Sequence, residues 1–112
     1  WAGMAAHASQ MDLSTQLSFY LPLQTAEAGG ELVLFHPPPP DARRAMEQLP
    51  FARAHEALEP HGFTAVPVGV GDLIMFDGGR WNHRVTTVRG DRTRWTIGGF
   101  AAPGPSQLFH WS

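Results

Sequence analysis

The sequence predicts a mainly β fold, of the β-sandwich, jelly-roll or barrel type, with one short helical insertion. Short apolar or alternating runs recur at close intervals and are separated by glycine and proline. One stretch of about twenty residues between these runs has helical signals instead. The chain of 112 residues is long enough for one small domain with a single compact core.

The first two strands are expected at residues 16–21 and 31–35. The first run, QLSFYL, alternates apolar with more polar side chains, which is typical of a half-buried strand. Pro22 should end its regular pairing or place it at a sheet edge. The second run, ELVLF, follows a glycine pair that closes the intervening loop.

The helical insertion is expected at about residues 41–62, after a run of four prolines that acts as a stiff spacer. Residues 41–49 start with an aspartate suited to an N-cap and stop before a proline. Residues 51–58 are compatible with a second short helix.

A second group of strands is expected after the insertion, at residues 64–68, 72–76, 82–88 and 93–97. A Gly-Asp turn between the last two favours a hairpin. The tail that follows residue 100 reads as a loop.

Four residues in this second group could carry chemistry. A hairpin would permit His83 and Arg92 to lie on one side of a sheet, with Arg94 and Thr96 on the same face as Arg92. Neutral imidazole is a good ligand for iron, zinc or copper. Guanidinium suits a bidentate grip on a carboxylate, and Arg94 competes with Arg92 for that role. A strand histidine without a ligand and a solvated turn arginine are the simpler interpretations, and they stay open.

Composition excludes several classes of protein. The net charge is −2 and all eight basic residues are arginine, so no basic stripe for a nucleic acid is expected. No apolar run reaches the roughly 18 residues of a membrane span, so no membrane is expected. Without cysteine there are no disulfides, thiolate zinc sites or cysteine nucleophiles, and a cytoplasmic location is compatible.

The chain resembles the C-terminal half of the 2-oxoglutarate/iron(II)-dependent oxygenases. The most specific match is NHRVTTVRGDR, in which an arginine follows a histidine by nine residues. The runs QLSFYLPL, GGELVLF and GDLIMF support it. The resemblance implies a double-stranded β-helix, or jelly roll, that forms one core over residues 1–112. Members of the family are usually longer, so a truncated chain or a core completed by a partner is expected, and the start at Trp1 agrees.

The resemblance also implies a site. Iron(II) would be held by His7 and His83, with Asp12 as a candidate for the carboxylate ligand. The far carboxylate of 2-oxoglutarate would pair with Arg92, assisted by Arg94 or Thr96. Dioxygen and a small-molecule substrate would complete the reaction, and the helical insertion would cover the substrate.

One departure from the family pattern leaves the reaction type open. Where the family has His-x-Asp, this chain has His7-Ala8-Ser9. Asp12 could supply the carboxylate, or the position could be empty, as in family members that halogenate, where chloride binds iron instead. In a third alternative His7 is misaligned and the site is degenerate.

The resemblance therefore implies oxidation of an unactivated C–H bond, by hydroxylation or halogenation. The alternative is a non-catalytic, cupin-like module that binds a small ligand. A zinc hydrolase is less well supported, because no third histidine or glutamate lies at helical i, i+4 spacing. The sequence leaves the substrate and the oligomeric state open.

Overall fold

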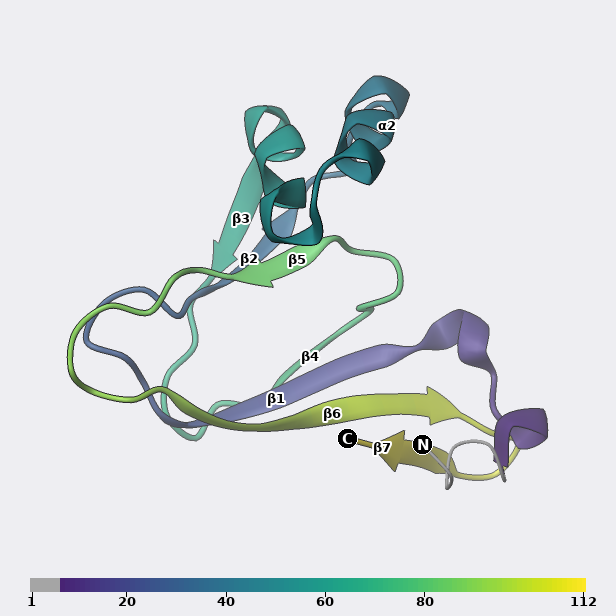
Figure 1. Ribbon diagram of the computed structural model, residues 1–112. Helices are drawn as coiled ribbons and strands as arrows, with labels where there is room; N and C mark the ends of the chain where they lie inside the picture. The colour runs from purple at the N-terminus through teal and green to yellow at the C-terminus, as the bar shows by residue number, and fades with distance from the viewer. Residues whose placement is uncertain (1–6) are drawn as a thin grey trace.

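Two antiparallel sheets make up most of the computed structural model, which describes residues 7–112 (Figure 1). The larger sheet has the strand order β4-β1-β6-β7 and the smaller one β3-β2-β5. The prediction of a mainly β protein is confirmed. No helix among the described residues is long and apolar enough to cross a membrane.

The larger sheet is built around its two longest strands. Its members are β4 (Ile74–Phe76), β1 (Leu17–Gln24), β6 (Trp95–Pro103) and β7 (Leu108–Trp111). Tyr20 is paired with Gly98 on one side and with Ile74 on the other. The register shifts between Pro22 and Gln24 because proline has no N–H to donate to the ladder. The predicted break in pairing at Pro22 is confirmed, although β1 continues past it.

The C-terminal tail is part of this sheet, so the prediction of a loop after residue 100 was wrong. β6 continues to Pro103, and β7 returns beside it with Phe100 opposite Trp111 and Ala102 opposite Phe109. Proline and glycine in the tail form the turn between these two strands. The pairing itself depends on the neighbouring strand, which local sequence does not reveal.

The smaller sheet contains β3 (Phe63–Val66), β2 (Leu32–Phe35) and β5 (His83–Val85). The predicted hairpin between the last two strand segments was wrong. β5 pairs with β2, whereas β6 pairs with β1 and β7, so the chain between Val85 and Trp95 crosses from one sheet to the other. His83 therefore faces the larger sheet across a space instead of lying beside β6.

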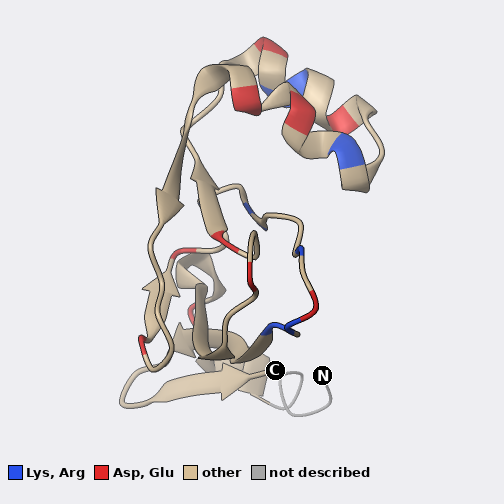
Figure 2. Cartoon of the chain, turned by 90° about the vertical axis from the view of Figure 1, so that its left-hand side faces the viewer, with Lys and Arg blue, Asp and Glu red and all other residues tan. Residues whose placement is uncertain are grey.

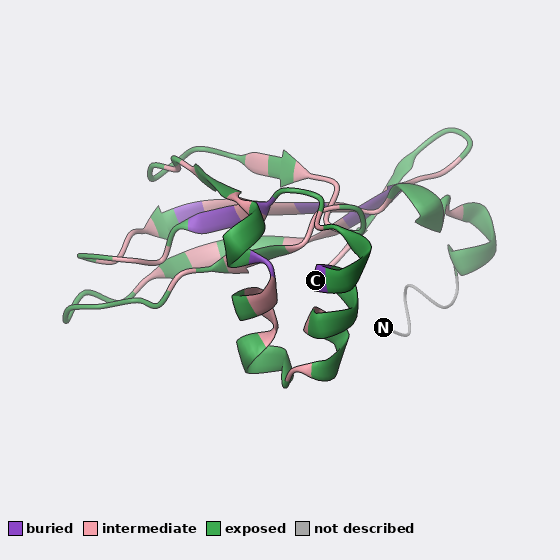
Figure 3. Cartoon of the chain, turned by 90° about the horizontal axis from the view of Figure 1, so that it is seen from above, coloured by how far each residue is buried: buried purple, intermediate pink, exposed green. Residues whose placement is uncertain are grey.

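The helical insertion consists of α2 (Pro40–Gln48) and two 3-10 helices, η3 (Phe51–Ala57) and η4 (Glu59–His61). The predicted helix at 41–49 is confirmed within one residue at each end. These helices lie over the smaller sheet, with mainly exposed outer surfaces (Figures 1 and 3). Charges of both signs are mixed on them, whereas the strands of the larger sheet carry few (Figure 2).

The apolar core of the smaller sheet lies under this insertion. Val33, Phe35 and Leu58 are buried together, with Met46 of α2 packed against them. Side chains alternate along a strand, so Leu32 points to the opposite face, toward the larger sheet. Leu32 is also buried, at 2% exposure. The space between the sheets is thus lined by side chains from both of them.

Candidate functional site

A cavity of about 360 Å³ lies between the two sheets. His83 and Val85 of β5 and Leu32 of β2 line it on one side. The opposite wall comes from β1, β4 and β6, from the residue just before β6 and from the C-terminal residue. Its polar members are Ser18, Tyr20, Arg94, Thr96 and Ser112. The fold therefore brings a histidine and an arginine from different sheets to one cavity.

His83 is held in an orientation that suits a metal ligand. Its Nδ1 lies 2.8 Å from the carbonyl oxygen of Trp81, so Nδ1 carries the proton and donates it there. The lone pair is then on Nε2. The ring packs edge-on against Phe76, with 4.9 Å between centroids. Metal-ligating histidines usually have such a backbone or carboxylate partner on the second nitrogen, and the side chain remains exposed to solvent.

Arg94 is the arginine that shares the cavity with His83. Its Nε donates to the carbonyl oxygen of Gly30 at 3.1 Å. Gly30 has a positive φ of 72°, and a Cβ at this position would lie 2.8 Å from Cδ of Arg94. Glycine is needed here both for the backbone conformation and for the passage of the arginine. Thr96 follows Arg94 on the same face, as alternation predicts.

Arg92 is placed differently from the sequence prediction. Its Nε and Nη2 donate to the carbonyl oxygens of Thr25 and Ala26, at 2.8 and 3.0 Å. It does not line the cavity with His83. Arg92 precedes β6 and belongs to the segment between Val85 and Trp95 that crosses between the sheets. The alternation of side chains along a strand therefore does not apply to it, and it does not share a face with Arg94. Its role in this position is to tie two loops together.

Ser18 is a polar residue of the cavity that sequence reasoning missed. It is 8% exposed, and its hydroxyl has no hydrogen-bond partner among the described residues. An unpaired buried hydroxyl costs about 1–3 kcal/mol, so native proteins normally satisfy it with a ligand or water. The sequence signal that could have indicated Ser18 is its position in an alternating strand, on the same face as Tyr20. The buried hydroxyl of Ser18 is thus a polar group in the wall of this cavity.

His7 and Asp12 lie outside this cavity. The His7 ring packs on Phe109, with 5.2 Å between centroids. Phe109 pairs with Ala102, and Ala102 lies on the same face of β6 as Phe100, two residues earlier. Phe109 therefore points to the same side of the sheet as Phe100, which lines the cavity. His7 thus lies over the inner face of the larger sheet, yet it is not among the residues that line the cavity with His83.

The Asp12 carboxylate is engaged locally. It caps the 3-10 helix η2 (Leu13–Thr15), accepting hydrogen bonds from the backbone N–H of Ser14 at 3.0 Å and from Oγ1 of Thr15 at 3.3 Å. The hydrogen bonds from Ser14 hold the pKa of Asp12 below its usual value. Within residues 7–112 no three His, Asp or Glu side chains come together as a metal cluster. The predicted set of His7, Asp12 and His83 is not assembled here.

Comparison with known families identifies the chain. The family described as the carrier-protein-independent halogenase WelO5 matches residues 4–112. The chain belongs to this family. The WelO5 family consists of iron- and 2-oxoglutarate-dependent halogenases, which confirms the resemblance to the wider oxygenase superfamily. No individual curated protein matches the chain.

The cavity offers part of what the two ligands of the WelO5 family require: one imidazole for iron, and a charge with a hydroxyl for a carboxylate. Nε2 of His83 is a suitable donor atom for iron. Arg94 and Thr96 offer a charge and a hydroxyl to a carboxylate, as 2-oxoglutarate requires. The orphaned Ser18 hydroxyl adds a polar group that lacks a protein partner in the described part of the chain.

Proposed function

We propose that this chain catalyses iron(II)- and 2-oxoglutarate-dependent halogenation of an unactivated C–H bond in a small molecule that is not attached to a carrier protein. The observation that carries the proposal is the cavity between the sheets, which is lined by both His83 and Arg94. Membership of the WelO5 family supports the halogenation outcome over hydroxylation. The two facing antiparallel sheets support a jelly-roll core over residues 1–112.

In this proposal His83 and His7 would hold the iron, although the described structure does not bring both rings to one cavity, and Arg94 with Thr96 would bind the far carboxylate of 2-oxoglutarate. His7 enters on the resemblance to the family pattern, and Phe109 fixes its ring above the inner face of the larger sheet. Iron with 2-oxoglutarate and dioxygen supplies the oxidising power. The protein would orient the cofactor.

Ser9 explains why a halide could bind. On the family pattern a serine stands where the oxygenases have an aspartate ligand, so one coordination position of a bound iron would be open to chloride or bromide. Asp12 is the nearest carboxylate in sequence, but it is already used to cap η2. Because the Asp12 carboxylate serves as this cap, we propose an iron site with two histidines and a halide instead of a protein carboxylate.

The test is spectroscopic and then chemical. Under anaerobic conditions the protein with iron(II) and 2-oxoglutarate should show the weak visible charge-transfer band of the chelate, and chloride should shift it. Admission of dioxygen should then give succinate. A protein that forms no chelate band and no succinate with added iron(II) and 2-oxoglutarate is not an enzyme of this class.

A non-catalytic module that binds a small ligand is the second candidate. It is favoured by the position of His7, which packs on Phe109 instead of lining the cavity. Such a module would bind a dicarboxylate through Arg94 without iron. Equal affinity for 2-oxoglutarate with and without a divalent metal would favour this candidate over the halogenase.

A further inference from the structure

The outer face of the larger sheet, which points away from the smaller sheet, is apolar. In the pairing of β1 with β6, Leu21 stands opposite Ile97 and Tyr20 stands opposite Gly98. Tyr20 and Gly98 line the cavity that holds His83, so they mark the inner face. Side chains alternate along a strand, and Leu21 and Ile97 therefore point to the outer face.

Four large apolar side chains of this outer face are exposed to solvent. They are Met75 of β4, Trp95 and Ile97 of β6, and Leu108 of β7, and each is between 50% and 61% exposed. The alternation of side chains and the pairing of Leu108 with Pro103 place them on one face. Leu17 and Leu21 of β1 are half-buried between them. These six side chains present roughly 500 Å² of apolar surface, which is near the upper end of what a monomeric protein leaves contiguous.

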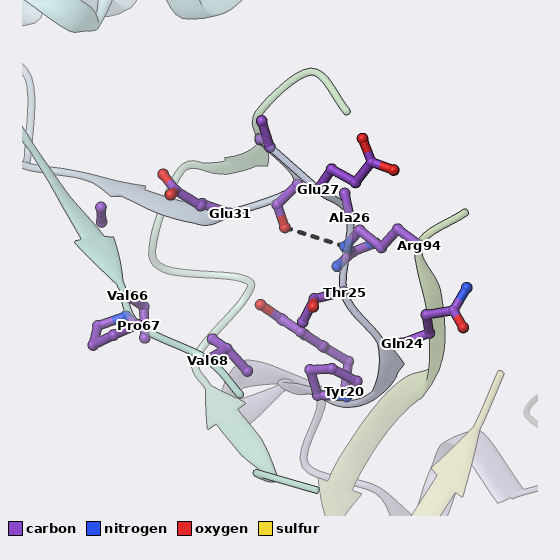
Figure 4. A pocket seen from close by; sticks show the side chains of 15 residues that line it. Tyr20, Gln24, Thr25, Ala26, Glu27, Glu31, Val66, Pro67, Val68 and Arg94 are labelled. Carbon is purple, nitrogen blue, oxygen red and sulfur yellow. Dashed lines mark hydrogen bonds between the residues drawn. The ribbon is translucent and has the colours of Figure 1, made fainter. Parts of the chain in front are cut away.

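Charged side chains are absent from this face. The outward-pointing positions in the paired parts of β4, β1, β6 and β7 include no Lys, Arg, Asp or Glu, and His110 is the one titratable residue among them. Tyr20 and Arg94 point to the other side, into a cavity of about 600 Å³ that Glu27 and Glu31 also line (Figure 4). The outer face is therefore suited to an apolar partner surface and not to a charged one.

A second copy of the chain has the surface that fits this face. Two antiparallel sheets pack face to face about 10 Å apart when their facing side chains are apolar. A two-fold axis between the central strands β1 and β6 would bring the same patch together from both copies. A standard interface buries about 800 Å² per partner, about two thirds of it apolar in homodimers, so roughly 500 Å² of apolar surface meets this requirement. The net charge of −2 causes little repulsion between copies.

We propose that the outer face of the larger sheet is a homodimer interface, with Leu21 and Ile97 at its centre and Met75, Trp95 and Leu108 around them. The cavity that holds His83 lies on the inner face, so it stays open to ligands in the dimer. The helical insertion lies beyond the smaller sheet and takes no part in the interface (Figure 1). This inference is independent of the proposed function, because it uses no residue that lines the cavity.

The first experiment measures the mass in solution by analytical ultracentrifugation, over a hundredfold range of protein concentration. The wild type should reach twice the 12.3 kDa mass of one chain. Ile97→Lys should raise the dissociation constant of the dimer at least tenfold, because it places an unpaired charge in an apolar interface. Phe51→Lys is the matched control, since Phe51 is an exposed apolar residue of the helical insertion, and it should dimerise like the wild type.

Two results of this experiment would overturn the inference. A wild type that is monomeric at every concentration would leave the outer face to a different polypeptide or to a lipid surface. A dimer that Ile97→Lys leaves unchanged would be formed through another part of the molecule.

The second experiment does not require the lysine variant to fold. The chain contains no cysteine, so Ile97→Cys introduces a single thiol without adding charge. A bulky maleimide should label this thiol at least tenfold more slowly at high protein concentration than after dilution, because the partner copy covers it. The thiol of Phe51→Cys stays exposed in both states and should be labelled at one rate throughout. Equal labelling rates for the two thiols at high concentration would show that the outer face is not covered by a second copy.

Discussion

Nδ1 of His83 lies 2.8 Å from the carbonyl oxygen of Trp81, two residues earlier in the chain. This contact fixes the tautomer and the direction of the ring before any metal arrives. The contact with Phe76 restrains the ring from the side. A ligand oriented in advance loses less conformational freedom on binding a metal, which favours a metal-binding role for His83.

His83→Ala should abolish iron-dependent succinate formation, because the variant lacks the imidazole that faces the cavity. Iron content after loading should fall at least tenfold, as expected for the loss of a metal ligand. His36→Ala is the control, since the His36 ring is hydrogen-bonded to Thr64 and does not line the cavity. Full iron content and turnover in His83→Ala would show that His83 is not a ligand.

Arg94→Ala and Arg92→Ala should have different effects. Loss of Arg94 removes the charge next to Tyr20 and should raise the dissociation constant of 2-oxoglutarate by about 10- to 100-fold. Loss of Arg92 removes hydrogen bonds to Thr25 and Ala26, so it should lower the free energy of unfolding by about 1 kcal/mol and leave affinity nearly unchanged. Calorimetry and chemical denaturation separate the two effects. A larger loss of 2-oxoglutarate affinity in Arg92→Ala than in Arg94→Ala would assign the carboxylate-binding role to Arg92.

Asp12→Asn should distinguish a capping role from a metal-ligand role. As a cap, Asp12 stabilises the fold above its ordinary pKa of 3.8 and loses this contribution as the pH falls through the lowered pKa of the folded state. The variant should therefore flatten the acid limb of the stability curve, measured by thermal unfolding against pH. Iron binding at pH 7 should be unaffected. Loss of iron in Asp12→Asn would instead identify Asp12 as the missing carboxylate.

Gly78→Ala should disturb the cavity. A Cβ at this position would collide with Oγ of Ser18 and lie 3.7 Å from Cε1 of His83. Crowding of this kind typically costs about 1–3 kcal/mol, which should appear as a lower melting temperature. Gly79→Ala is the neighbouring control, because its nearest atom, on Asp77, is 3.6 Å away. Equal melting temperatures for the two variants would argue against close packing of Ser18 beneath Gly78.

Leu58→Ala should test how firmly the helical insertion is attached. Leu58 is 3% exposed and packs with Val33 and Phe35 of the smaller sheet. Its truncation should cost about 2–5 kcal/mol, measured by denaturant unfolding. Phe51→Ala is the control because Phe51 is 99% exposed. A similar small loss in both variants would show that the insertion contributes little to this core.

The sequence by itself determined the local elements and the kind of chemistry. Alternation in QLSFYL, the apolar run ELVLF and the proline-bounded helix are local patterns, and each gave an element close to its observed bounds. Through its resemblance to the oxygenases, the HRVT segment made His83 and a nearby arginine the candidates for binding iron and a carboxylate.

Only the tertiary structure decided which side chains meet. Strand pairing depends on contacts between distant segments, so the separation of β5 and β6 into different sheets had no local signal. That separation removed Arg92 from the cavity and placed Arg94 there. Ser18 is indistinguishable from an ordinary strand residue in the sequence, because its burial and its lack of a hydrogen-bond partner are properties of the packed molecule.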